Sequence, residues 1–288
     1  MKGPETLIDN AGRLKTRMGQ AFVGTRAVFR GHDLHADLRD MDWLELFVFG
    51  ITGRRFTASQ MRMLHAMWVY TSYPDARIWN NRVAALAGST RSTPGLGISA
   101  ALAMSEATIY GGHPFVSAID FLGRARRAVA HGTALADFVA LELKGQRIYG
   151  YGRPIASVDE RLPWLIDLAK ELHLDAGPHL AIAFEVEHIL VARDPRLRMN
   201  YAALMAAIAA DMGLTPNELH HFQVPVFLAG MSPCFIEASE RPPGTVFPLS
   251  CEHIAYEGAA KRRWRASTPA GSARDTESRS NHPPRPRP

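Results

Sequence analysis

The amino-acid sequence predicts an all-α protein. Two capping boxes, Thr57–Gln60 and Thr215–Glu218, stand ahead of apolar helical stretches. In each box, the threonine hydroxyl and the side chain three residues later satisfy backbone N–H groups that the start of a helix leaves open. Apolar residues recur at helical spacing along the chain, whereas the alternation that marks a strand is scarce. Helices should therefore build nearly all of the fold.

Caps, apolar periodicity and helix breakers predict the helices in order. Pro163 opens one helix, Pro216 takes the first position of another, and Gly213 is the C-cap of the alanine-rich stretch before it. The segment Gly150–Pro154 is a strong break between helical regions. The predicted helices cover residues 42–50, 61–70, 97–109, 115–130, 134–143, 164–172, 179–191 and 201–212, and one more follows Thr215.

Size and composition fit a cytoplasmic protein with a full core. The chain has 288 residues, of which 47% are hydrophobic. Its apolar runs are far shorter than the roughly 20 residues that cross a bilayer, and residues 1–20 lack the apolar centre of a signal peptide. We therefore expect no membrane segment. Cys234 and Cys251 fit a reduced compartment as two free thiols and are too few for a zinc cluster.

The net charge of +5 is concentrated at the C-terminal end. Residues 261–288 carry eight basic and two acidic side chains, so that this segment has a charge of +6. Residues 1–260 carry 25 basic and 26 acidic side chains, which gives −1. A neutral body lacks the broad basic face that nucleic acids require, so we expect no nucleic-acid partner. The segment 261–288 is rich in Ser, Pro and Arg, and we predict that it is disordered.

Two motifs suggest functions that their context does not support. Gly95–Ala100 matches a dinucleotide-binding fingerprint, but a Ser/Thr-rich loop precedes it where that fold needs a strand. It is better explained as a helix start with small residues for close packing. His32, Asp33 and His35 lack a further ligand at a suitable spacing, so we expect no metal site. His220 and the histidine after it are expected at a surface or an interface.

Four groups of segments, in the right order, resemble the citrate synthase family. The first group, Phe29–Leu34 with Thr57–Met61, is similar to the family's pattern YRG-D-I, and the second, Arg82–Ala85 with Ile98–Leu102 and Tyr110–Gly112, is similar to ARV-A with ISAA and GPLHGG. The third group, Gly150–Arg153 with Asp159–Arg161, is similar to GFGHRVY with DPR. The fourth, Asn200–Pro216 with Phe227–Ala229 and Tyr256–Gly258, is similar to NVDF-SG with LGIP. The resemblance covers about residues 25–260 and rests on the order and spacing of the segments. The short chain resembles the compact, citryl-CoA lyase-like branch.

The resemblance implies a citrate synthase-like fold, in which a smaller helical domain is inserted into a large helical one. The large domain would comprise residues 1–110 and 200–260, and the small domain residues 111–199. Members of the family are homodimers, and each active site lies in the cleft between the domains. Closure of that cleft excludes water from the reacting thioester.

The resemblance also implies that the three catalytic residues of the family are replaced. Citrate formation needs a carboxylate base near the methyl of acetyl-CoA and hydrogen-bond donors for the enolate and the ketone oxygens. The family uses an Asp and two His. The enolate His falls on Tyr110, the carbonyl His on Arg153 and the Asp on Ala202. Tyr110 and Arg153 can still donate hydrogen bonds, whereas Ala202 cannot act as a base. The Arg that follows the family's Leu-Ala pair is Gly230 here.

Five more residues near the matched positions are candidates for the site. His113 is either an alternative base or a solvated loop residue, and Arg91 is either an anion ligand or a surface arginine. Asp159 and Arg161 either bind substrate or pair with each other. Tyr151 flanks the glycine turn, where it either lines the cleft or packs in the core.

Two functions follow from these replacements. In the first, the protein is a divergent enzyme that forms or cleaves a carbon–carbon bond in an acyl-CoA or a related carboxylate, with Tyr110 and Arg153 as donors. In the second, it is a non-catalytic protein that keeps the fold to bind a ligand or a partner chain. We expect no bound cofactor, with coenzyme A entering only as part of a thioester substrate.

Overall fold

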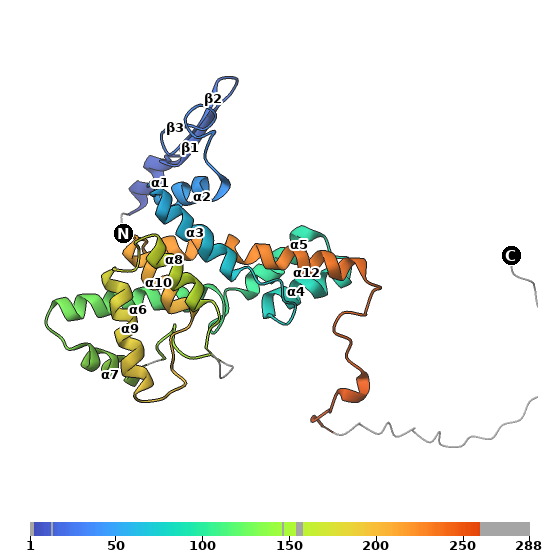
Figure 1. Ribbon diagram of the computed structural model, residues 1–288. Helices are drawn as coiled ribbons and strands as arrows, with labels where there is room; N and C mark the ends of the chain where they lie inside the picture. Colours follow the sequence, from blue (N-terminus) through green and yellow to red (C-terminus); the bar gives the residue numbers. More distant parts are fainter. Residues whose placement is uncertain (1–2, 13, 146, 154–157, 260–288) are drawn as a thin grey trace, which may run out of the picture. The chain divides into compact units, whose positions relative to one another are not determined.

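Helices make up most of the structure, which confirms the predicted all-α class (Figure 1). The computed structural model describes residues 3–12, 14–145, 147–153 and 158–259. The helices are α1 (Pro4–Asn10), α2 (Trp43–Thr52), α3 (Ala58–Thr71), α4 (Trp79–Ser89), α5 (Pro94–Met104), α6 (Gly112–Ala130), α7 (Leu135–Gly145), α8 (Leu162–Glu171), α9 (Pro178–Val191), α10 (Tyr201–Asp211), α11 (Pro216–Gln223) and α12 (Leu228–Glu240). Short 3₁₀ turns span Pro225–Phe227 and Cys251–His253.

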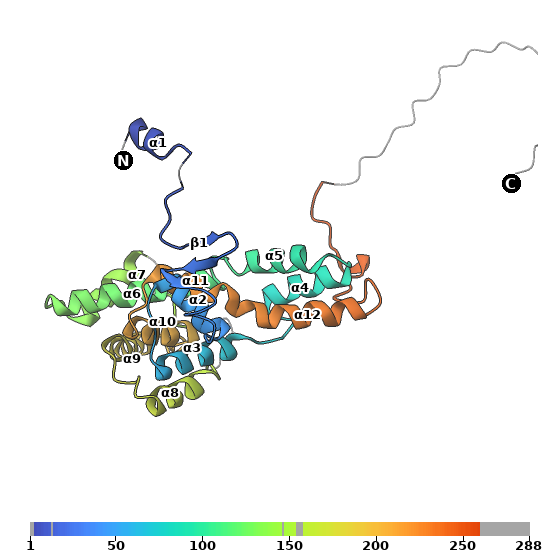
Figure 2. The ribbon, with the colours of Figure 1, turned by 90° about the horizontal axis from the view of Figure 1, so that it is seen from above.

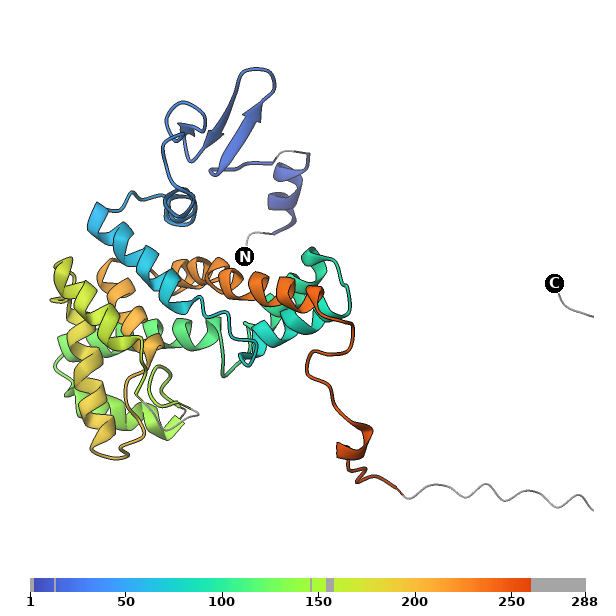
Figure 3. The same ribbon diagram turned by 45° about the vertical axis from the view of Figure 1, so that its right-hand side comes forward.

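A small antiparallel ribbon precedes the helices α2–α12 (Figure 3). It consists of β1 (Gly19–Phe22), β2 (Arg26–Phe29) and β3 (His32–Asp33), and β2 pairs with both others. Arg30 ties the ribbon to α2, because its guanidinium donates to the carbonyls of Gly50 and Ile51 at 2.7–3.0 Å. These donations satisfy carbonyls that the end of a helix leaves open. The sequence did not predict the ribbon.

The chain divides into two units, residues 1–248 and residues 249–288. In the second unit, residues 249–259 are described and all of them are exposed. The predicted disordered segment 261–288 lies outside the described residues. The domain boundaries implied by the family resemblance, 111–199 within 1–110 and 200–260, stay a prediction.

Helix α10 is the centre of the core in the first unit. Its residues 201–209 are all buried, and it packs against α6 and α9. A helix that is apolar on every side must be covered on every side, and the alanines let the neighbouring helices come close. Gly213 follows α10 with φ +81°, in the left-handed conformation expected of a C-cap. The predicted helix 201–212 is thereby confirmed.

Helices α4, α5 and α12 pack side by side (Figure 2). A Cβ added to Gly97 would lie 2.7 Å from the ring of Phe235, and one added to Gly88 would lie 2.2 Å from the carbonyl oxygen of that residue. The glycines of the Gly95–Ala100 motif thus lie in a helix start, and Gly97 serves close packing, as predicted.

One helix prediction needs correction in this region, and two helices were not predicted. Helix α5 ends at Met104 instead of residue 109, because the chain then turns and the N–H of Gly112 donates to the carbonyl of Ser105 at 2.8 Å. Helices α4 and α12 were not predicted. The first is rich in Asn, Ala and Gly, and the second contains Pro233 in its interior, so both lack a strong local helix signal.

Candidate active site

Tyr110 lies in the turn between α5 and α6, and its hydroxyl is held in place. It donates to Oδ1 of the buried Asn80 at 2.9 Å, and Nδ2 of Asn80 donates to the hydroxyl of the buried Ser105 at 3.0 Å. The ring packs edge-on against Trp79, with centroids 5.2 Å apart. Burial raises the pKa of the Tyr110 hydroxyl above its ordinary value, and the positive charge of Arg161 opposes this only in part. Tyr110 is therefore a neutral, oriented hydrogen-bond donor.

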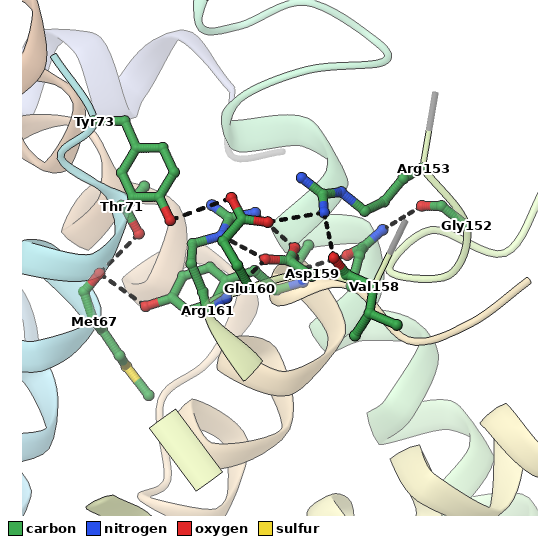
Figure 4. Close-up of polar contacts among 12 residues, drawn as sticks. Met67, Thr71, Tyr73, Gly152, Arg153, Val158, Asp159, Glu160 and Arg161 are labelled. Carbon is green, nitrogen blue, oxygen red and sulfur yellow. Dashed lines mark hydrogen bonds and ion pairs between the residues drawn. The ribbon is translucent and has the colours of Figure 1, made fainter. Parts of the chain in front are cut away.

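Asp159 and Arg161 pair with each other, which is one of the two arrangements that the sequence left open, and a role in substrate binding stays a prediction (Figure 4). The carboxylate of Asp159 is completely buried. Nε and Nη2 of Arg161 donate to its two oxygens at 2.8 and 2.7 Å, and the N–H of Tyr201 donates at 3.0 Å. The guanidinium also lies over the ring of Tyr201, 4.4 Å from its centroid. Asp159 thereby fixes Arg161 against the start of α10.

Arg153 meets a second carboxylate, Glu160, beside this buried pair (Figure 4). Its Nη1 donates to the carbonyl of Val158 at 2.9 Å and to Oε2 of Glu160 at 3.1 Å. The other carboxylate oxygen, Oε1, accepts from the hydroxyl of Tyr73 at 3.3 Å. The side chain of Glu160 is 57% exposed and that of Arg153 is 19% exposed. We call Tyr73, Arg153 and Glu160 the Arg153–Glu160 cluster.

The glycine turn before Arg153 is anchored to the start of α10. The N–H of Asn200 donates to the carbonyl of Gly150 at 2.9 Å, and the side chain of Asn200 donates to the carbonyl of Gly152 at 2.8 Å. Oδ1 of the same Asn200 caps α10 by accepting from the N–H of Ala202 at 2.9 Å. One asparagine therefore holds the matched positions 153 and 202 in the same part of the fold.

Ala202 leaves the matched base position without a carboxylate of its own, and the two acids nearest to it in sequence are occupied elsewhere. Asp211 accepts from the N–H of His179 at 2.9 Å and from Nδ1 of its ring at 2.7 Å, and it also accepts from the N–H of Leu180. It thus caps the start of α9. Asp194 pairs with the arginine two residues further on at 2.8 Å.

The other predicted site residues make structural contacts. Tyr151 is buried, and its hydroxyl donates to the carbonyl of Ala183 at 2.9 Å. Arg91 donates to the carbonyls of Gly88 at 3.3 Å and Arg241 at 2.7 Å, next to the ends of α4 and α12. His113 is exposed in the first turn of α6, edge-on to Tyr149 at 5.1 Å. A role for these three in substrate binding or catalysis stays a prediction.

Sequence reasoning missed Asn80, Ser105, Tyr73 and Glu160. Of these, only Glu160 stood inside a segment of the family resemblance, between Asp159 and Arg161. Nothing in the described part of the chain forms a cluster of three or more His, Cys, Asp or Glu residues that would suit a metal ion. Within the same part, no helix has the length and apolar character needed to cross a membrane.

Comparison with known proteins places this geometry in a known fold. No protein-family model matches the sequence, and no curated protein matches it. Citryl-CoA lyase from Hydrogenobacter thermophilus has a similar structure, with a TM-score of 0.75 and 22% identity over 88% of this chain and 97% of the lyase. ATP citrate lyase from Methanothrix soehngenii, solved with citrate and coenzyme A, gives a TM-score of 0.67 at 18% identity, over 90% of this chain and 45% of that one.

Citrate synthase from Thermoplasma acidophilum, solved with carboxymethyl coenzyme A and oxaloacetate, is also similar. The TM-score is 0.61 at 19% identity, over 78% of this chain and 59% of the synthase. The chain therefore spans nearly all of the lyase but less than two thirds of the synthase. The protein has the fold of citrate synthases, in the compact form seen in citryl-CoA lyase.

Proposed function

We propose that the protein is a divergent citrate synthase-like enzyme that forms or cleaves a carbon–carbon bond next to a coenzyme A thioester. The proposal rests on one observation: two of the three positions matched to the family's catalytic residues hold hydrogen-bond donors in a fixed orientation. Tyr110 is fixed by Asn80 and kept neutral by burial, and Arg153 is held in the Arg153–Glu160 cluster. The charge of Arg161 also acts on Tyr110.

The two donors fit the two oxygens of such a reaction. Tyr110 would bind the thioester oxygen, where negative charge develops as the enolate forms. This requires its proton to turn from Asn80 to the ligand, and Asn80 Oδ1 would then keep the N–H of Asn81 at 2.8 Å as a partner. Arg153 would bind the ketone oxygen or a carboxylate with its guanidinium group. A preorganised donor of this kind contributes about 10²–10³ in kcat.

The substrate class is inferred from the fold neighbours and from these donors. Structures with the same fold hold citrate with coenzyme A, and (3S)-citryl-CoA. We propose a β-hydroxyacyl-CoA with a further carboxylate, such as citryl-CoA, as the substrate. Coenzyme A would enter the reaction only as part of this thioester. A cytoplasmic location remains part of the proposal, because both described cysteines are free thiols.

Turnover of citryl-CoA tests the proposal. The wild-type protein is expected to convert it to acetyl-CoA and oxaloacetate, measured by mass spectrometry of the thioesters. Tyr110→Phe and Arg153→Ala should each lower kcat/KM by about 100-fold. Arg62→Ala is the matched control, because Arg62 pairs with Glu171 on the surface with a side chain that is 58% exposed, and this variant should keep full activity. Absence of turnover in both directions, from citryl-CoA and from acetyl-CoA with oxaloacetate, would refute the proposal.

A non-catalytic role is the second candidate, and two positions favour it. Ala202 offers no base. Gly230 stands where the family has an arginine, and a Cβ there would lie 2.5 Å from the carbonyl oxygen of Tyr73, so this backbone admits no side chain at that position. In this case coenzyme A or citryl-CoA would raise the melting temperature, because a ligand of the native state adds stability, but no product would form.

We also propose that the chain acts as a homodimer, as the family resemblance implies. Helix α5 supports this, because Leu96 is 70% exposed and Ala100 and Ala103 lie exposed on the same helix. An apolar helix face of this kind is suited to close packing against a second copy. Light scattering should give twice the 31.8 kDa of one chain, and Leu96→Glu should reduce the mass toward that of one chain. A wild-type monomer at micromolar concentration would contradict this.

A further inference from the structure

Glu160 differs from the other carboxylate of the site in its access to a ligand. Asp159 is completely buried, and both of its oxygens are occupied by Arg161. The side chain of Glu160 is 57% exposed, and each of its oxygens has one side-chain contact, Oε2 with Arg153 at 3.1 Å and Oε1 with Tyr73 at 3.3 Å. Glu160 can therefore meet a ligand that reaches the cluster, whereas Asp159 can only hold Arg161 in place.

We propose that Glu160 is a catalytic acid–base residue that exchanges the proton of the substrate oxygen bound by Arg153. This inference rests on the proposed function and adds a residue to it. Arg153 Nη1 and Glu160 Oε2 are already at hydrogen-bond distance, so an oxygen held by the same guanidinium lies within reach of the carboxylate. A general base must lie within about 2.6–3.2 Å of the proton-bearing atom, or one water away.

The assignment gives a balanced cleavage step. The β-hydroxyl of the thioester, bound by Arg153, passes its proton to Glu160. The oxygen's electrons form the ketone as the bond between the carbinol carbon and the adjacent CH₂ breaks, and the electron pair of that bond forms the thioester enolate, whose oxygen Tyr110 binds. The enolate carbon takes one proton from water to become the methyl group, and Glu160 returns its proton to the hydroxide left behind. The products are a ketone and an acyl-CoA.

This assignment places the acid–base chemistry at the oxygen end of the reaction. The family resemblance places a carboxylate at the carbon end, at position 202, and this chain has Ala202 there. With Glu160 at the other end, proton transfer at carbon is left to water, and Ala202 is compatible with turnover. In the direction of condensation the same steps run in reverse, and Glu160 protonates the oxygen as the ketone becomes an alcohol.

The substitution Glu160→Gln tests the role with little change in shape. Glutamine keeps an oxygen that accepts from Tyr73 or Arg153, so the fold should be preserved, but it cannot take up a proton. With citryl-CoA, we expect kcat to fall by about 100-fold or more and KM to stay nearly unchanged, because the group that is lost acts only in the transition state. Glu160→Asp should recover part of the loss.

Glu171→Gln is the matched control. Glu171 is also 57% exposed and also pairs with an arginine, Arg62, at 2.7 Å on α8 and α3, and this variant should keep wild-type kcat. An unchanged kcat in Glu160→Gln would overturn the inference. So would a lower KM with kcat retained, because Glu160 would then merely occupy an anion site on Arg153 that the substrate has to reclaim.

The same series separates this inference from the proposed function. A wild-type protein without turnover in either direction refutes both. An active wild-type protein whose activity falls in Tyr110→Phe but not in Glu160→Gln refutes the role of Glu160 alone. If Glu160→Gln melts well below the wild type, both variants are assayed at a temperature where each is folded, and an equal kcat of Glu160→Gln and Glu160→Asp would refute proton transfer by this side chain, because only Asp keeps a carboxylate that can take up a proton.

Discussion

Replacing Asp159 by alanine is expected to lower the free energy of unfolding by about 3 kcal/mol, because it leaves the Arg161 charge without its partner. The carboxylate of Asp159 is completely buried, and the side chain of Arg161 is 22% exposed. The residual exposure of the arginine puts the loss at the lower end of the range for broken buried pairs. The N–H of Tyr201 would also lose its acceptor. Urea denaturation followed by circular dichroism measures the change.

A surface pair provides the control for this substitution. Asp194 and Arg196 are joined at 2.8 Å by the same i, i+2 pattern of contacts, but the side chain of Arg196 is 84% exposed. Removing Asp194 should therefore cost at most about 1 kcal/mol. Equal losses in Asp159→Ala and Asp194→Ala would contradict a special contribution from the buried pair.

The buried pair should also make stability depend on pH. Burial opposes the charge on Asp159, but the hydrogen bonds and charge of Arg161 outweigh it and hold the pKa of the carboxyl below its ordinary value. A lowered pKa in the folded state stabilises the fold above the unfolded pKa of about 3.9, and this contribution is lost as the pH falls through the folded value. The advantage of the wild type over Asp159→Asn should be complete above about pH 5 and shrink below about pH 4.

Local signals in the sequence predicted the helices that have them. Both capping boxes are present, with Thr57 accepting from Gln60 N–H and Thr215 accepting from the N–H three residues on. Helices α4 and α12 lack such signals, and long-range packing on each other and on α5 determines them instead. The role of Gly88 follows only from the structure, in which the backbone of Phe235 packs directly against it.

The candidate site was even harder to predict from local sequence signals than the helices. The family resemblance located Tyr110 and Arg153, but other residues of the site come from distant parts of the chain. Asn80 lies 30 positions before Tyr110, and Tyr73 lies 87 positions before Glu160. Hydrogen bonds of this range leave no periodicity or spacing in a single sequence. The pairing of Asp159 with Arg161 likewise depends on the burial of the carboxylate, which the local sequence does not encode.

Replacing Gly111 by alanine is expected to unfold or strongly destabilise the region that carries Tyr110. Gly111 has φ +81° and ψ −136°, a conformation that only glycine adopts readily and that costs an L-residue at least about 1–2 kcal/mol. An added Cβ would also fall 1.8 Å from the carbonyl oxygen of Ser105, far inside contact distance. Because Ser105 binds Asn80 and Asn80 orients Tyr110, relief of this clash must disturb the donor itself.

The substitution Gly132→Ala separates the conformational cost of a positive φ from the steric clash of an added Cβ. Gly132 has φ +87°, and no atom lies within 4 Å of the position of an added Cβ, so that Gly132→Ala carries the conformational cost alone, about 1–2 kcal/mol. Gly111→Ala adds the overpacking cost, typically 1–3 kcal/mol, for a total of roughly 2–5 kcal/mol by thermal or urea unfolding. Gly111→Ala should also lose turnover of citryl-CoA, and Gly132→Ala should keep it. Equal stability of the two variants would mean that Ser105 yields freely, and that the Ser105–Asn80 link does not hold Tyr110 in place.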